Sequence, residues 1–245
     1  MRIQVLFFGV LRDLVGRSGE TLELADGSKA GAVLRHYSEM SSRIAAMLPS
    51  VALSVNQEYA TADAALRAGD EVALLPPVSG GSVEVEMARD DVRIVREEID
   101  AEAVIAATKR PEDGAAVVFD GVVRDNTRGR RTLYLDYEAY EKMALKQMGG
   151  LAEEARSRFG VRQVALVHRL GRLEIGETSV LIVVASAHRE PAFEACRWII
   201  DTLKKTVPIW KKEYFEDGAV WADGEPFPEE IRCGGGTAGG ATASK

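Results

Sequence analysis

The chain has 245 residues, 46% of them hydrophobic and 28% charged, which is typical of a globular protein with one large or two medium domains. The net charge of −7 argues against a general nucleic-acid-binding protein. No apolar run approaches the ~18 residues that a membrane-spanning helix needs, so no membrane association is expected.

The first 81 residues show the pattern of a small α+β domain. Ile3, Val5 and Phe7 alternate with polar residues, as in a half-buried strand. A helix is predicted at residues 32–40, and further strands are predicted at residues 19–24, 51–55 and 72–75. The order strand, strand, helix, strand, strand is that of a β-grasp domain, although other small α+β folds share it. The apolar start is followed by Arg12 and lacks a small-residue cleavage site, so it predicts a strand and a cytoplasmic protein instead of a signal peptide.

Residues 74–81 read Leu-Leu-Pro-Pro-Val-Ser-Gly-Gly, which resembles the activated tail of a ubiquitin-like sulfur carrier. Such carriers react through the free carboxyl group of their last glycine. Two residues without side chains could thread a narrow channel and present that carboxyl carbon. Here Ser82 follows Gly81, which suggests that a carrier is fused to the enzyme it serves.

The rest of the chain, to about residue 232, alternates strands and helices. Strand-like stretches are predicted at residues 91–99, 115–119, 132–140, 164–168 and 180–185. Helices are predicted at residues 101–109, 142–159 and 191–205. The glycine-rich residues 233–245 are predicted to be disordered.

Four lysines follow the strongest predicted helix: Lys204, Lys205, Lys211 and Lys212. The apolar stripe of this helix comprises Phe193, Cys196, Ile199, Ile200 and Leu203. Lys204 lies four residues after Ile200, at the edge of the stripe, which favours a partly desolvated amine. Lys205 lies four residues after Asp201, on the solvated side. Lys211 is expected in a loop anchored by Pro208 and Trp210. A solvated, charged helix end is the alternative interpretation of the whole cluster.

Two further basic segments could bind an anion. His188 and Arg189 follow a buried strand and precede a helix, where free backbone N–H groups point outward. Arg124 leads into an arginine-rich loop that also contains Arg128, Arg130 and Arg131. Exposed loop arginines are the alternative in both cases. His36 and His168 are expected to be structural.

Known metal and nucleotide motifs are missing from the sequence. Cys196 and Cys233 have no ligand spacing, so no metal site is expected. There is also no phosphate-binding loop, dinucleotide fingerprint or HExxH motif.

Residues 1–81 resemble the small, sulfur-carrier subunit of molybdopterin synthase, and residues from about 87 to 232 resemble its large, catalytic subunit. The first resemblance rests on Val55-Asn56-Gln57, Gly69-Asp70-Glu71-Val72-Ala73 and Pro76-Pro77-Val78-Ser79-Gly80-Gly81. The second rests on Gly121-Val122-Val123-Arg124, Ser186-Ala187-His188-Arg189 and the segment from Leu203-Lys204 to Pro208-Ile209-Trp210-Lys211-Lys212-Glu213. The resemblance implies an α+β protein with a β-grasp domain at 1–81, an α/β hammerhead-type catalytic domain at 82–232 and a tail at 233–245.

The resemblance also implies the reaction. A thiocarboxylate on Gly81 would donate sulfur to cyclic pyranopterin monophosphate, and two transfers would build the dithiolene of molybdopterin for molybdenum cofactor biosynthesis. Lys204 and Lys211 would be catalytic, and Arg124, His188 and Arg189 would bind the anionic pterin. Flanking residues of the pocket would be Val122, Val123, Lys212 and Glu213, although the family often has a basic residue in the place of Val122.

The implied partners follow from this chemistry. An ATP-dependent adenylating enzyme and a sulfur-donor protein would load Gly81, no cofactor would be bound permanently, and the catalytic domain would form a homodimer. Terminal adenylation needs a free carboxyl group, so the bond from Gly81 to Ser82 would have to be cleaved. The alternative is a non-catalytic ubiquitin-like carrier or interaction protein with a scaffold domain.

Overall fold

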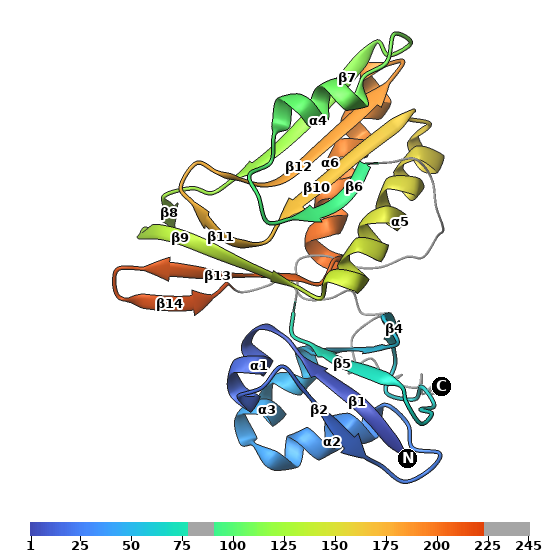
Figure 1. Cartoon of the computed structure of the whole chain (residues 1–245), viewed down its shortest axis with the longest axis vertical. Helices are drawn as coiled ribbons and strands as arrows, with labels where there is room; N and C mark the ends of the chain where they lie inside the picture. The colour runs from blue at the N-terminus through green and yellow to red at the C-terminus, as the bar shows by residue number, and fades with distance from the viewer. Residues whose placement is uncertain (78–90, 223–245) are drawn as a thin grey trace, which may run out of the picture. The chain divides into compact units, whose positions relative to one another are not determined.

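A computed structural model describes residues 1–77 and 91–222 of the chain (Figure 1). These residues divide into two compact units, one chiefly within residues 1–76 and the other chiefly from residue 91 onward. The predicted domain boundaries, at Gly81–Ser82 and at residues 232–233, lie outside the described residues, as do Gly81 itself and the glycine-rich tail. Within the described ranges, no helix has the length and apolar character needed to cross a membrane.

The first unit is a mixed five-stranded sheet with helices packed against it. The strand order is β2 (Gly19–Glu23), β1 (Arg2–Phe7), β5 (Glu71–Leu75), β3 (Ala52–Val55) and β4 (Glu58–Ala60). The helices are α1 (Gly9–Val15), α2 (Gly31–Met40), α3 (Ser42–Met47) and the short 3₁₀ turn Leu48–Ser50. The central strands β1 and β5 are parallel, and the other neighbours are antiparallel.

The core of this unit follows the alternation that the sequence predicts. Ile3, Val5 and Phe7 point to one face of β1 and are buried. The ring of Phe7 meets the ring of Tyr37 from α2 edge to face, with centroids 5.0 Å apart. The predicted β-grasp fold of the N-terminal part is confirmed.

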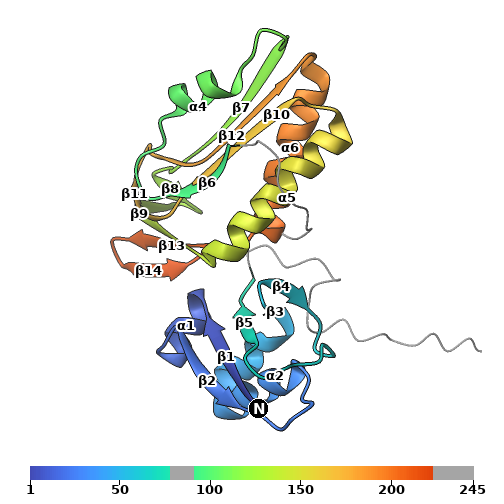
Figure 2. The ribbon, with the colours of Figure 1, turned by 45° about the vertical axis from the view of Figure 1, so that its right-hand side comes forward.

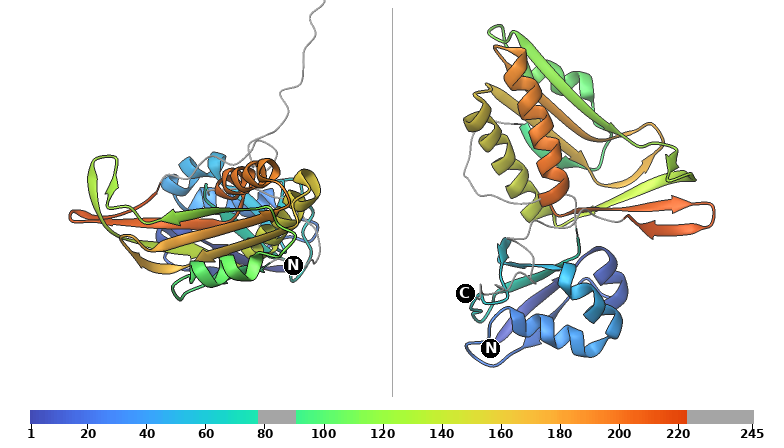
Figure 3. Two further views of the ribbon diagram at one scale, coloured as in Figure 1. Left: turned by 90° about the horizontal axis from the view of Figure 1, so that it is seen from above. Right: turned by 180° about the vertical axis from the view of Figure 1, so that it is seen from behind.

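The second unit contains a four-stranded sheet covered on both faces. The strand order is β6 (Asp91–Val95), β10 (Gln163–Arg169), β12 (Thr178–Ser186) and β7 (Ala115–Val122). Helices α5 (Glu141–Phe159) and α6 (Arg189–Thr206) lie side by side on one face, and α4 (Ala101–Thr108) lies on the other (Figures 2 and 3). In β10, Val164 and Leu166 pack towards α5 and α6, whereas Ala165 and Val167 pack with Val104 of α4.

A second sheet in this unit carries much of the functional site. Its strand order is β11 (Gly171–Glu174), β9 (Arg130–Ala139), β13 (Ile209–Phe215) and β14 (Gly218–Trp221), and the short β8 (Asn126–Thr127) also pairs with β9. The prediction that Lys211 lies in a loop is therefore wrong. Pro208 ends α6 as expected, but the next residues pair antiparallel with β9, so that Lys211 lies opposite Tyr137. This long-range pairing outweighs the weak strand propensity of the charged residues at 211–213.

The predicted arginine-rich loop is also more ordered than expected. Its residues form a β8–β9 hairpin in which Thr127 pairs with Arg130. The two turn residues, Arg128 and Gly129, both have positive φ, at 52° and 82°. Positive φ at both turn residues matches the twist of the two flanking strands. The hairpin therefore sets the direction of the chain that follows Arg124.

Candidate active site

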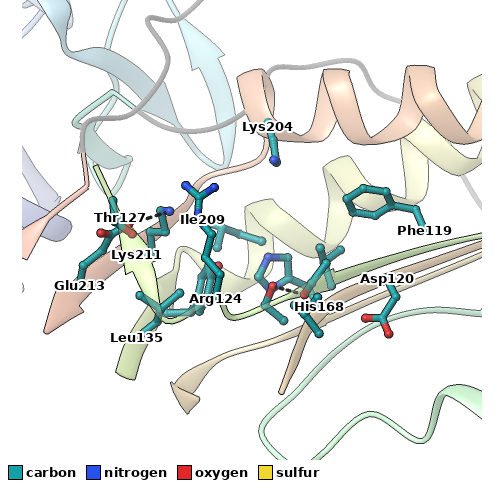
Figure 4. Close-up of a pocket in the computed structure, with 15 residues that line it drawn as sticks. Phe119, Asp120, Arg124, Thr127, Leu135, His168, Lys204, Ile209, Lys211 and Glu213 are labelled. Atoms are coloured by element: carbon teal, nitrogen blue, oxygen red, sulfur yellow. Dashed lines mark hydrogen bonds and ion pairs between the residues drawn. The ribbon is translucent and has the colours of Figure 1, made fainter. Parts of the chain in front are cut away.

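A pocket of about 380 Å³ opens in the second unit (Figure 4). Its walls come from β7, β10 and β12 of the four-stranded sheet, from β9 and β13 of the second sheet, and from the last turn of α6. Of the nine site residues predicted in this unit, five line the pocket: Val122, Arg124, Lys204, Lys211 and Glu213. The tertiary fold thus brings together residues that are up to 91 positions apart in the sequence.

Lys204 reaches the pocket from the last turn of α6. The apolar stripe of α6 buries Cys196, Ile199, Ile200 and Leu203 as predicted, although Phe193 at its other end is 61% exposed. Lys204 itself is exposed in the single chain, so the expected partial desolvation of its amine is not seen. Lys205 lies on the solvated side as predicted, and Asp201, four residues before it, pairs with Arg197 at 3.4 Å.

Lys211 and Glu213 reach the pocket from β13. The two residues are separated by one position and therefore share a face of the strand. The Lys211 ammonium donates to the Glu213 carboxylate at 2.8 Å, and the Glu213 side chain is only 5% exposed. Lys212 lies on the opposite face, with its amine 5.2 Å from the centre of the Trp221 ring, and does not line the pocket.

The Gly121-Val122-Val123-Arg124 segment forms one wall at the end of β7. A β-carbon at position 121 would lie 2.6 Å from Val180 Cγ1, so glycine lets β7 pass close to β12 here. Val122 lines the pocket, whereas Val123 is buried in a small cluster with Leu135 and Leu173. Arg124 follows at the pocket wall, and Val123 acts as its apolar anchor instead of contributing to the lining.

His188 and Arg189 lie far from this pocket within one chain. Arg189 is the first residue of α6 and Lys204 lies in its last turn. Fifteen residues of α-helix separate them by roughly 22 Å. Both His188 and Arg189 are exposed, so in the single chain they do not join the other predicted site residues.

His168 lines the pocket, although the sequence analysis expected it to be structural. The signal was available in the alternation of β10. Val164, Leu166 and position 168 share a face, and a polar residue interrupts an otherwise apolar series there. His168 is 4% exposed, and burial lowers the pKa of its imidazole to about 4, so the ring is neutral at pH 7.

A second pocket of about 230 Å³ shares Arg124, Lys211 and Glu213 with the first. Its lining adds Arg128 from the hairpin turn and Arg130 from the start of β9. Arg130 is held by an ion pair with Asp217 and by the ring of Phe215, 3.8 Å from its guanidinium carbon. Arg128 and Arg130 therefore border the site, although the arginines of this hairpin are exposed, as the alternative interpretation also expects.

The charge distribution of the main pocket suits an anionic ligand. Figure 4 shows the side chains of Arg124 and Lys204 extending towards each other from opposite sides of the pocket, with Lys211 near Arg124 and the imidazole of His168 below them. The carboxylate of Glu213 is engaged by Lys211, so the other charged groups of the lining are Arg124, Lys204 and Asp120, with the two cations in excess. Groups of this kind can bind a phosphate and stabilise negative charge that develops during a reaction.

Comparison with known proteins places this site in a family. Residues 94–206 match the family model described as MoaE protein. Over 141 residues the chain is 42% identical to the molybdopterin synthase catalytic subunit of Pyrococcus abyssi, which covers 57% of this chain and 95% of that protein. The chain belongs to the MoaE family. All the residues of the main pocket except Ile209, Lys211 and Glu213 fall within the matched part of the MoaE domain.

Two further comparisons agree with this assignment. The catalytic subunit of Halalkalibacterium halodurans is 44% identical over 128 residues, which cover 52% of this chain and 82% of that protein. The crystal structure of molybdopterin synthase from Staphylococcus aureus is 40% identical, with a TM-score of 0.53, and the match covers 56% of this chain and 99% of that one. Residues 5–81 match the ThiS family, so a sulfur-carrier domain precedes the MoaE domain in the same chain.

Proposed function

We propose that this chain is a molybdopterin synthase that carries its own sulfur donor. In this reaction the thiocarboxylate of a carrier's terminal glycine transfers sulfur to cyclic pyranopterin monophosphate, and two transfers form the dithiolene of molybdopterin. The observation that carries the proposal is the pocket of the MoaE domain, where Arg124, Lys204 and Lys211 gather around one space. The substrate carries a phosphate and the donor is a thiocarboxylate, so both reactants are anions.

Lys204 and Lys211 are the proposed catalytic residues. Each ammonium can donate a proton and can stabilise an anionic intermediate as sulfur is added to the pterin. The buried Glu213 accepts from Lys211 at 2.8 Å and so fixes the position of its ammonium on β13. Lys204 has no ion pair among the described side chains and lies at the exposed end of the pocket, where it can meet an incoming thiocarboxylate.

Arg124, His188 and Arg189 are the proposed ligands of the substrate's phosphate. Arg124 lines the pocket of its own chain, but His188 and Arg189 lie at the far end of α6. We therefore propose a homodimer through the MoaE domain, in which the partner subunit supplies this histidine and arginine. Val122 belongs to the pocket wall, whereas the positions of Val123 and Lys212 remove them from the proposed site.

Gly81 is the proposed carrier terminus, and the proposed domains are residues 1–81 and 82–232. A β-grasp domain of the ThiS family ends its match at residue 81, where the Gly80–Gly81 pair stands. An ATP-dependent enzyme would adenylate the freed carboxyl group, and a sulfur-donor protein would convert it to the thiocarboxylate.

The reaction itself tests this proposal. The full chain is incubated with cyclic pyranopterin monophosphate and with residues 1–81 prepared as the C-terminal thiocarboxylate, and formation of the dithiolene is followed. We expect product only when the carrier bears the thiocarboxylate. A chain that binds the thiocarboxylated carrier but forms no product would support the scaffold alternative and contradict the enzyme.

A further inference from the structure

His168 stands where the apolar core of the MoaE domain opens into the pocket. β10 lies between β6 and β12, with His168 opposite Ile94 on one side and Val180 on the other. The ring of Tyr137 from β9 meets the imidazole edge to face, with centroids 5.3 Å apart. Neighbours on three strands thus fix the ring in the pocket lining, and Figure 4 shows it between Arg124 and Phe119.

One ring nitrogen of His168 already makes a hydrogen bond within the protein. Nδ1 lies 3.0 Å from the carbonyl oxygen of Arg169. A carbonyl oxygen can only accept, so Nδ1 must carry the proton in a neutral imidazole. Within residues 1–77 and 91–222 the ring makes this single hydrogen bond. Nε2 therefore keeps a lone pair and is a hydrogen-bond acceptor.

The carbonyl that fixes this tautomer is itself held in place. The guanidinium of Arg169 pairs with Glu177 at 3.2 Å and donates to the carbonyl oxygen of Arg96 at 3.3 Å. Burial lowers the pKa of His168 to about 4, so the ring does not become a further cation at neutral pH. The state of the imidazole is thus determined by the backbone and by burial, before any ligand is bound.

Among the described side chains that line this pocket, Nε2 of His168 is the neutral atom that can only accept a hydrogen bond. Arg124, Lys204 and Lys211 are donors only, and the hydroxyl of Ser179 donates to the carbonyl oxygen of Gly121 at 2.7 Å. Asp120 and Glu213 are charged acceptors, of which Glu213 is engaged by Lys211, and the hydroxyls of Thr127 and Tyr137 can either donate or accept. A ligand that offers both a phosphate and ring N–H groups would need the cations for the first and an acceptor such as Nε2 for the second.

We propose that His168 determines specificity for the pterin, with Nε2 accepting a hydrogen bond from a ring N–H or amino group of the bound substrate while the basic residues hold its phosphate. This inference rests on the proposed function and adds a residue that recognises the heterocycle. It predicts that changes at His168 affect binding of the pterin and leave binding of a bare phosphate unaltered.

Two substitutions of His168 separate recognition from packing. His168→Gln keeps an acceptor near the position of Nε2, whereas His168→Leu removes it. In full-length protein we expect His168→Leu to raise the Kd for cyclic pyranopterin monophosphate by about 10-fold or more, because the ligand's donor loses its partner. We expect His168→Gln to stay within about 3-fold of the unsubstituted chain. Since the contact is present before and during reaction, KM should change more than kcat.

Inorganic phosphate is the second probe, since it can contact the cations but has no ring N–H to donate. Its Kd, measured by the same titration, should be the same for His168→Leu and the unsubstituted chain. The matched control is Thr108→Val, which removes another buried polar group, one that donates to the Val104 carbonyl within α4 at 2.7 Å and lies outside the pocket. It should leave both affinities unchanged.

Each remaining outcome contradicts the inference in a recognisable way. Equal weakening of pterin and phosphate by His168→Leu would show a structural role, and an unchanged pterin Kd would show no role. Either result would leave the proposed function intact if the unsubstituted chain still binds and converts the pterin. Binding of phosphate but not of pterin by the unsubstituted chain would overturn the proposed function and this inference together.

Discussion

Neighbouring lysines at the end of α6 have different surroundings. Both are exposed in the single chain, but Lys204 lines the pocket and Lys205 lies outside its lining. Loss of a general acid–base group typically costs about 10²–10⁴-fold in rate. We therefore expect Lys204→Ala to slow dithiolene formation by that factor and Lys205→Ala to leave it nearly unchanged. Both rates are measured with pre-thiocarboxylated carrier, so that sulfur loading does not contribute, and a slower Lys205→Ala variant would refute the assignment.

The buried imidazole of His168 makes stability depend on pH. Its pKa is lowered from 6.5 to about 4 by burial, so between these values the unfolded chain binds a proton that the folded chain does not. The contribution of His168 is therefore complete above pH 6.5 and is lost as the pH falls towards 4. At pH 5 the loss is on the order of 2 kcal/mol. His168→Gln removes this titration.

Urea unfolding of the two proteins at pH 7.5 and pH 5 measures this effect. All three tryptophans, Trp198, Trp210 and Trp221, lie in the second unit, so their fluorescence reports its unfolding separately from that of the first. Other groups titrate in both proteins and cancel in the comparison. We expect the unsubstituted chain to lose more stability between the two pH values than His168→Gln, and equal losses would show that the imidazole is not protected from protonation.

At the scale of elements, two glycines of the MoaE domain have opposite environments. A β-carbon at Gly121 of β7 would lie 2.6 Å from Val180 Cγ1, whereas one at Gly149 of α5 would have no atom within 4 Å. Gly121→Ala should thus destabilise the second unit by about 1–3 kcal/mol through overpacking. Gly149→Ala should stabilise it by up to about 1 kcal/mol, because alanine is the better helix former. The same fluorescence-detected unfolding checks both values, and a stabilising Gly121→Ala would show that β7 can move away from β12.

The sequence predicted elements with strong local signals and missed those that depend on distant pairing. Alternation in β1 and the apolar stripe of α6 come from burial on one face, which the sequence records directly. β13 was predicted as a loop, because Lys211 and its charged neighbours have weak strand propensity and their partner β9 is about 70 residues away. The site shows the same division. Lys204 and Lys211 could be proposed from motifs, but whether position 168 faces core or pocket depends on where three strands meet.

At the scale of the whole molecule, the two ends of α6 cannot both serve one pocket of the same chain. Arg189 and Lys204 are roughly 22 Å apart along the helix. If both act on one substrate, the partner subunit's Arg189 must reach the pocket that contains Lys204, as a two-fold symmetric dimer permits. Arg189→Ala and Lys204→Ala chains, each of low activity, should then complement each other. A mixed dimer would have one site with both defects and one intact site.

Mixing the two variants after dissociation and reassociation measures this complementation. With random pairing, half of the dimers are mixed and half of their sites are intact, so about a quarter of the normal activity should return. Arg189→Ala mixed with Arg189→Ala is the control and should regain nothing. If the combination of the two variants stays as inactive as its parents, each pocket is complete within one chain and Arg189 acts elsewhere.

The fusion itself requires one more chemical step, at the bond between Gly81 and Ser82. A peptide carbonyl cannot be adenylated as a terminal carboxylate can, so we expect active material to be cut after Gly81. Ser82→Pro should resist proteolysis, because proline removes the amide hydrogen at the cleavage position, and Ser82→Ala is the control that should be cut normally.

In a reaction with the activating enzyme, ATP and a sulfur donor, uncut Ser82→Pro should form no dithiolene. Addition of a separate carrier of residues 1–81 should restore its turnover, because the pocket of the MoaE domain is unchanged. Intact-mass measurement gives the extent of cutting, and full turnover by a wholly uncut chain without a separate carrier would rule out the requirement for cleavage.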